Sequence, residues 1–142
     1  MLAFGLCAGC NAQNKDNLLE SLQAYNDALR WRRHESASKY LRGRARAHFV
    51  NAADRRGDVR VTHYQIRHVK FVGSKRAVVL VRFNWYSELR GRMHHTTMTQ
   101  HWDSKGDWHI TDQRWVRGPT LPLLAAAPAP KRRLGAIPTA KK

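Results

Sequence analysis

The spacing of apolar residues changes once along the chain, from helical in the first part to alternating in the second. Leu18, Leu22, Tyr25 and Leu29 recur every three or four residues, which predicts one buried face of an amphipathic helix. Three further apolar residues are expected to widen this buried stripe: Leu19, Ala28 and Trp31. Residues 11–17 are polar and predict a lead-in whose last two residues are candidate N-caps.

Two shorter helical stretches and a turn follow this first helix. Residues 35–41 carry apolar side chains on one side, and residues 45–53 do so again after an interruption at Gly43. Arg56-Gly57-Asp58 has the composition of a turn. The chain is therefore predicted to begin with helices and to continue with strands.

Four alternating segments after this turn predict four β-strands. In the first, residues 59–71, the apolar phase slips twice, and such slips indicate bulges. The second, residues 77–89, is apolar on both faces at its start, as a central strand would be. A third strand is predicted over 92–102, and a hairpin loop at 103–107 leads into a fourth over 108–116. Short turns join antiparallel neighbours, so the fold class is α+β, with N-terminal helices packed on a four-stranded antiparallel sheet.

Composition divides the 142 residues into three segments around one domain. Residues 1–10 are an apolar leader and residues 11–118 form the folded domain. All five prolines lie after Gly118, among alanines and basic residues. Residues 119–142 are therefore predicted to form a flexible basic tail.

The net charge of +16 predicts an anionic partner. Much of this charge lies between residues 28 and 60, a segment that contains ten lysines and arginines but three acids. The residues expected to contact the anion are six arginines: Arg30, Arg32, Arg33, Arg42, Arg44 and Arg46. The alternative is that these cations form a solvated surface with no ligand, because charge alone supports solubility as readily as binding.

The fold prediction can be sharpened by a resemblance over residues 17–117. The helix Tyr25-Asn26-x-x-Leu29-Arg30-Trp31, the long strand 61–71 and the hairpin Trp102-x5-Trp108-x-Ile110 resemble the nuclear transport factor two-like (SnoaL-like) superfamily. The resemblance implies a cystatin-like cone, in which a curved sheet surrounds a long helix. Sheet-to-sheet dimers are common in that superfamily, so a homodimer through the sheet is implied. The superfamily includes both enzymes and non-catalytic proteins, so the fold alone implies no activity.

The N-terminal leader ends at a cysteine with small residues before it. Ala8-Gly9-Cys10 resembles the last three positions of a bacterial lipobox, as in uncharacterised proteobacterial lipoproteins of this layout. The resemblance implies cleavage before Cys10 and lipidation of this residue. Asn11 in the next position implies sorting to the outer membrane, on its periplasmic side. Two alternatives remain open: a Cys7-Ala8-Gly9-Cys10 redox pair, and an apolar N-terminus without a signal.

The histidines and tryptophans are the remaining candidates for chemistry. His94 and His95 point to opposite faces of a strand, and His95 and His101 lie about 20 Å apart along it. His109 could face His101 across the hairpin, but two ligands are fewer than zinc requires. We expect Trp115 to be an exposed contact and three tryptophans to be core: Trp85, Trp102 and Trp108. No catalytic residue, metal or cofactor is predicted.

Three hypotheses about function follow, and we favour the first. The chain is predicted to be a non-catalytic, lipid-anchored envelope protein whose basic surface binds an anionic envelope component or a partner protein. The first alternative is a basic module that binds nucleic acid through phosphate contacts. The second is a small-molecule binder or enzyme that uses the cone pocket, and a closed, packed cone would argue against it.

Overall fold

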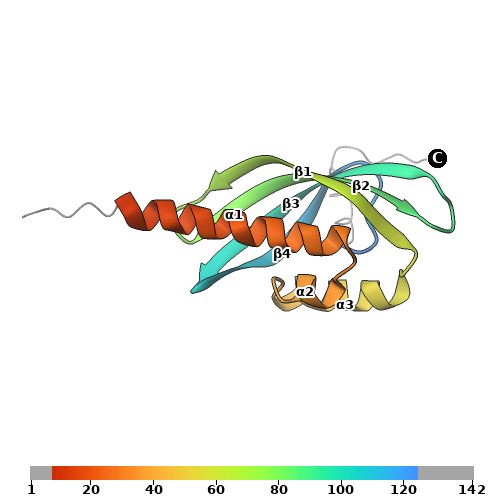
Figure 1. Cartoon of the computed structure of the whole chain (residues 1–142), viewed down its shortest axis with the longest axis horizontal. Coiled ribbons are helices and arrows are strands. Elements are labelled where there is room, and N and C mark those ends of the chain that lie inside the picture. Colours follow the sequence, from red (N-terminus) through yellow and green to blue (C-terminus); the bar gives the residue numbers. More distant parts are fainter. Residues whose placement is uncertain (1–7, 125–142) are drawn as a thin grey trace, which may run out of the picture.

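The computed structural model describes residues 8–124, and the side chains from residue 12 onward. Within this range, three helices precede four strands, as the change of period predicts (Figure 1). The elements are α1 (Ala8–Arg30), α2 (His34–Ser38), α3 (Gly43–Arg55), β1 (Val59–Phe71), β2 (Arg76–Ser87), β3 (Met93–Lys105) and β4 (Asp107–Arg117).

The four strands form one antiparallel sheet in the order β1-β2-β3-β4. The register of β1 against β2 shifts between Val61 and His63 and again between Ile66 and His68. These are the two bulges that the slips in apolar phase predict, because each extra residue moves the following side chains to the opposite face. β2 lies between β1 and β3, which confirms the prediction of a central strand.

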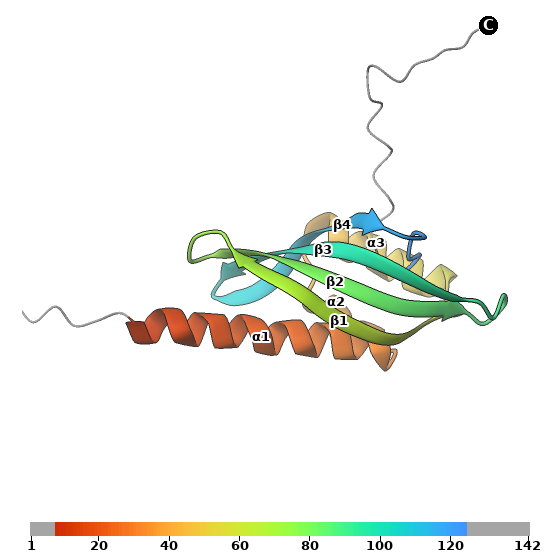
Figure 2. The ribbon, with the colours of Figure 1, turned by 90° about the horizontal axis from the view of Figure 1, so that it is seen from above.

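All three helices share one hydrophobic core with the sheet. α1 runs along one face of the sheet, α3 lies beside β4, and α2 packs against α1 and α3 (Figures 1 and 2). The link between α2 and α3 pairs with β4: the Arg42 amide donates to the Ile110 carbonyl at 2.9 Å, and the Ile110 amide donates to the Tyr40 carbonyl at 2.7 Å. This link covers part of the edge strand, which would otherwise leave peptide groups open to another chain.

The core lies between α1 and the face of the sheet that α1 covers, which we call the inner face. Tyr25 of α1 is fully buried and its ring meets the ring of Trp102 edge to face, with centroids 6.2 Å apart. The three tryptophans predicted for the core are buried: Trp85, Trp102 and Trp108. The helical stripe is narrower than predicted, since Leu19 is 43% exposed and Trp31 is 62% exposed.

Several predicted boundaries are wrong. α1 begins at Ala8, so the predicted lead-in at 11–17 is helical. Tertiary contacts hold these early turns, since Asn14 donates to the Ser74 carbonyl at 2.6 Å and its own carbonyl accepts from the Trp108 indole at 3.2 Å. The predicted loop at 103–107 is mostly strand, because β3 and β4 extend to a tight turn at Gly106, whose φ is +89°. Leu89 lies beyond β2 and is 85% exposed.

The start of the predicted flexible tail belongs to the core. Leu121, Leu123 and Leu124 are each 1% exposed and join the hydrophobic cluster. Pro119 anchors this segment, because its carbonyl accepts a hydrogen bond from the Thr96 hydroxyl. The three leucines supply apolar side chains that the proline-rich composition conceals, so the folded domain extends at least to Leu124 rather than ending at Gly118. Residues 125–142 of the predicted tail lie outside the described residues.

Candidate anion-binding surfaces

The predicted lipidation site lies at the beginning of α1. Cys10 is in the first turn of the helix, and its side chain lies outside what the structure describes. Residues 1–7 of the predicted leader also lie outside the described residues. The first turns of α1 project past the ends of the strands in both views (Figures 1 and 2). Asn14, four residues after Cys10, marks where the helix meets the sheet.

Four lysines gather at this end of the molecule, which we call the lysine end: Lys15, Lys70, Lys75 and Lys105. Lys15 follows Asn14 on α1, Lys70 and Lys75 flank the β1–β2 turn, and Lys105 ends β3. A bond from the Ser104 amide to the Lys75 carbonyl, 2.8 Å long, holds the two hairpins together. Three acids lie close to these lysines: Asp16, Asp103 and Asp107. Of these, Asp103 is already paired with Arg76 at 3.8 Å.

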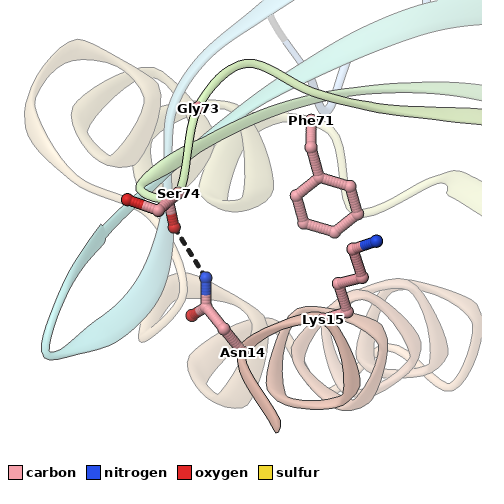
Figure 3. Close-up of a pocket in the computed structure, with 5 residues that line it drawn as sticks. All are labelled: Asn14, Lys15, Phe71, Gly73 and Ser74. Carbon is pink, nitrogen blue, oxygen red and sulfur yellow. Dashed lines mark hydrogen bonds between the residues drawn. The ribbon is translucent and has the colours of Figure 1, made fainter. Parts of the chain in front are cut away.

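A hollow of about 270 Å³ lies between α1 and the β1–β2 turn at the lysine end. Figure 3 shows Asn14 reaching the Ser74 carbonyl and Lys15 lying against Phe71. The Lys15 ammonium is 5.5 Å from the centroid of the Phe71 ring, a cation–π arrangement. The Lys15 side chain therefore lies over an aromatic ring and holds its charge at this end.

The sequence could not reveal the lysine end as a unit. Lys75 and Lys105 are far apart along the chain, and the pairing of β2 with β3 brings their segments together. Lys15 joins them because the neighbouring Asn14 bonds to Ser74 and Trp108. The visible signal is weaker: every lysine before the tail except Lys39 lies next to a predicted turn or near the helix start. The register of the strands, which cannot be read from the sequence, brings these separate positions onto one surface.

The six arginines predicted to bind an anion do not form one patch. Arg30, Arg32 and Arg33 lie at the turn from α1 to α2. Arg32 adopts a φ of +59° and donates from its guanidinium to the Gly57 carbonyl at 2.7 Å, so it holds the start of β1. Arg30 lies over the ring of Trp31, 5.0 Å from the ring centroid. Arg32 is therefore a structural residue, whereas Arg30 and Arg33 are exposed.

The other three arginines lie at the start of α3, whereas Arg32 reaches Gly57 just beyond the end of this helix. Arg42 precedes the helix, and Arg44 and Arg46 are in its first turns, with no acid beside them. The Arg42 guanidinium donates to His109 Nε2 at 2.7 Å, and burial together with Arg42 holds the pKa of His109 below its usual range. A helix of 13 residues is about 20 Å long, so the two arginine groups lie apart.

The interior of the cone, which the small-molecule hypothesis requires to be open, is filled by side chains. The Tyr25 hydroxyl donates to Gln113 Oε1 at 3.1 Å, and the Gln100 amide donates to Asn26 Oδ1 at 2.9 Å. Trp102 donates to Gln100 Oε1 at 3.2 Å. All five residues are at most 3% exposed, and burial raises the pKa of Tyr25 far above its usual range. These buried polar groups therefore satisfy one another across the interface between α1 and the sheet.

The histidines do not converge on one point. His94 packs on Trp85, with ring centroids 4.6 Å apart, whereas His95 is exposed. The predicted pairing of His101 with His109 is wrong, because a bulge puts His101 opposite Asp112 and His109 opposite Asp103. Among the residues described by the structure, no three His, Cys, Asp or Glu side chains are grouped as a metal site.

Comparison with known proteins supports the fold and leaves the function open. No family model and no curated protein matches this chain. A solved structure from Nostoc punctiforme, a domain of unknown function with a cystatin-like fold, superposes with a TM-score of 0.58. The match covers 77% of this chain and 80% of that one, at 17% identity. The chain thus has a cystatin-like α+β fold, as the sequence predicts.

Proposed function

We propose that this chain is a non-catalytic protein of the bacterial envelope, anchored through lipid on Cys10, whose lysine end binds the anionic surface of the membrane that holds it. One observation carries the proposal. Asn14 and Lys15, about one helical turn beyond Cys10, lie against the β1–β2 turn, and the other three lysines lie beside the hairpin turns at the same end of the sheet. An anchor at Cys10 would therefore bring the lysine end to the lipid headgroups.

The energies are consistent with such a mode of attachment. A lysine near an anionic membrane surface contributes about 1 kcal/mol. Several acyl chains give stable anchoring where a single chain does not, and basic residues strengthen it. No helix in the described range is long and apolar enough to cross a membrane.

The structure favours this proposal over the two alternatives. The cone-pocket hypothesis requires an open interior, but Tyr25 and Trp102 fill the space between α1 and the sheet. The nucleic-acid hypothesis relies on phosphate contacts by the basic residues at 42–60. α3 separates these residues into two groups, and two members of the later group are already ion-paired: Arg56 with Asp58 and Arg60 with Glu88. A divided patch tracks a phosphate backbone less well than a continuous one.

Intact mass and membrane fractionation test the anchor directly. The chain expressed from its native locus is expected in the membrane fraction, as a diacyl or triacyl species that begins at Cys10. Cys10→Ser should yield an unmodified chain outside the membrane fraction, while the matched control Cys7→Ser should retain the lipid. A soluble, unmodified wild-type chain that keeps Met1 would overturn the proposal and favour a nucleic acid or another acidic partner.

Vesicle binding tests the role of the lysine end separately from the anchor. The Cys10→Ser chain is mixed with vesicles of phosphatidylglycerol and phosphatidylcholine. Replacing Lys70, Lys75 and Lys105 by Gln should weaken binding by about tenfold or more, given about 1 kcal/mol for each lysine. The control replaces Lys39, Arg44 and Arg46 by Gln, which removes the same charge from another surface. Equal losses in the two variants would show general attraction and contradict an oriented lysine end.

A further inference from the structure

The face of the sheet that points away from α1, which we call the outer face, contains a hollow of about 310 Å³. All four strands contribute to its lining. The lining residues are Arg67, Leu80, Arg82, His95, Thr97, Val116 and Arg117. Three arginines and a histidine therefore surround a space whose lining includes no carboxylate.

Two bulges bring the outermost lining residues to this hollow. Ile66 pairs with Val81 and His68 pairs with Leu80, so Arg67 is the extra residue of the bulge in β1. On the other side, Thr97 pairs with Arg117 and Met98 with Trp115, so Val116 is the extra residue in β4. A bulge turns a side chain away from the direction that strict alternation would give it, and bulges are frequent next to binding sites.

The centre of the hollow is a single row across the sheet. Arg82 of β2, Thr97 of β3 and Arg117 of β4 are direct neighbours in register. Strands lie about 4.8 Å apart, so the two arginines begin about 10 Å apart on either side of the Thr97 hydroxyl. Arg67 lies beside this row, since its guanidinium donates to Gln65 Oε1 at 3.1 Å and Gln65 pairs with Arg82.

The arginines of this hollow differ from the other arginines on the outer face. Arg60, Arg76 and Arg114 each form an ion pair, with Glu88, Asp103 and Asp112 respectively. Arg67, Arg82 and Arg117 form no ion pair with any carboxylate in residues 12–124. The outer face therefore neutralises its peripheral arginines and leaves the central three without a counter-ion.

His95 is held in place beside these arginines. Its Nδ1 lies 2.7 Å from Asn84 Oδ1, and because an amide oxygen only accepts, the imidazole donates through Nδ1. Its Nε2 is then the other ring nitrogen, and it donates to a phosphate oxygen when the ring is protonated. Asn84 and His95 are direct cross-strand neighbours, one row from Arg82 and Thr97, so the ring is positioned by the register of the sheet.

We propose that this hollow, the sheet-face pocket, binds a phosphate group carried on a small organic molecule. The charge of three guanidinium groups matches a dianionic phosphate better than a single carboxylate, and guanidinium forks pair with phosphate oxygens through two parallel bonds. Thr97 adds a hydroxyl donor at the centre. Leu80 and Val116 supply apolar surface for the organic part, and the hollow is larger than a bare phosphate needs. The pocket is independent of the anchor proposed above.

Calorimetric titration of the full-length chain tests the pocket, with glycerol 3-phosphate as the probe and glycerol as the uncharged control. Saturable binding of one glycerol 3-phosphate per chain is expected, and none of glycerol. Arg82→Gln and Arg117→Gln should each lower the affinity about tenfold or more, since each removes charge-assisted bonds to the phosphate. Arg44→Gln and Arg46→Gln, which remove the same charge from α3, should change it less than about twofold.

Two further measurements separate the possible outcomes. Backbone amide NMR shifts on titration should centre on His95, Thr97 and Arg117, and a response centred on α3 would overturn the proposal. Competition with phosphatidic acid vesicles distinguishes a lipid headgroup from a free phosphate ester, and displacement by either source supports the pocket. Equal losses in the pocket and α3 variants, or no saturable binding of either probe, would overturn it.

Discussion

The inner and outer faces of the sheet are made by alternate residues of the same strands, yet the polar side chains at their centres differ in whether they find partners. On the inner face, the Gln100 and Gln113 side chains bond to partners within the core. On the outer face, Arg82 and Arg117 flank Thr97 without a carboxylate partner in the described part of the chain. The buried glutamines of the inner face thus find hydrogen-bond partners within the protein, whereas these arginines of the outer face have no negative charge beside them in the described residues.

This difference bears on the expected homodimer. Two copies meeting through their outer faces would bring six central arginines together, because each copy contributes Arg67, Arg82 and Arg117. Like charges in direct opposition destabilise a pairing. The dimer through the sheet therefore stays a prediction, and such a dimer would require an anion between the two copies. An anionic ligand, in contrast, could balance the charge of the three arginines within a single copy.

The largest expected effect comes from breaking the inner face. Trp102→Ala should lower the free energy of unfolding by about 3–5 kcal/mol, because it leaves a cavity among buried rings and removes the partner of Gln100. The matched control is Trp31→Ala, which removes the same side chain where it is 62% exposed, with an expected change within about 0.5 kcal/mol. Urea denaturation of both variants measures the difference, and similar losses would contradict the contrast between buried and exposed tryptophans.

The inner face is also the part that the sequence predicts best. Burial on one face forces alternation, so Val79, Val81 and Phe83 predict both the strand and the side that faces the core. The two slips of phase in β1 predict its bulges. The prediction that Trp31 and Leu19 are buried is wrong, because helical periodicity does not show how wide a stripe the sheet can cover.

The outer face is predictable only in part. The slip of phase after Ile66 is visible in the sequence. The register of all four strands, which the sequence does not show, then places Arg67 at the same hollow as Arg117. The clustering of arginines between residues 28 and 60 was a misleading signal, because sequence proximity does not place side chains on one surface. The lysine end has the same origin as the sheet-face pocket, because both are assembled from segments that are far apart along the chain.

A smaller effect is expected from acidifying the outer face. Burial, followed by Arg114, holds the pKa of His101 below its usual range, and burial with Arg42 does the same for His109. A group with a lowered pKa in the folded state binds protons more readily when unfolded. Its stabilising contribution is therefore present above the ordinary histidine pKa of about 6.5 and is lost as the pH falls through the lowered value.

The melting temperature should consequently fall between pH 7.5 and pH 5, a range in which Asp58, whose pKa is also lowered, stays ionised. Thermal denaturation monitored by circular dichroism measures this fall. His101→Gln and His109→Gln should each reduce its slope, while the exposed His63→Gln serves as the control. A melting temperature that rises on acidification, or slopes unchanged in both variants, would contradict the assignment.

The smallest effect sharpens the comparison most, because it concerns the two kinds of outer-face arginine. Arg60→Gln removes an exposed ion pair with Glu88 and should cost between about 0 and 1 kcal/mol. The double variant Arg82→Gln with Arg117→Gln removes two unpaired like charges and should leave stability within about 0.5 kcal/mol of the wild type, or raise it slightly.

Adding glycerol 3-phosphate should then raise the melting temperature of the wild type and of Arg60→Gln, but not that of the double variant, since only a folded chain with its ligand site is stabilised by binding. A clear loss of stability in the double variant without ligand would mean that these arginines hold the sheet together, and would place both kinds of outer-face arginine in the same structural role.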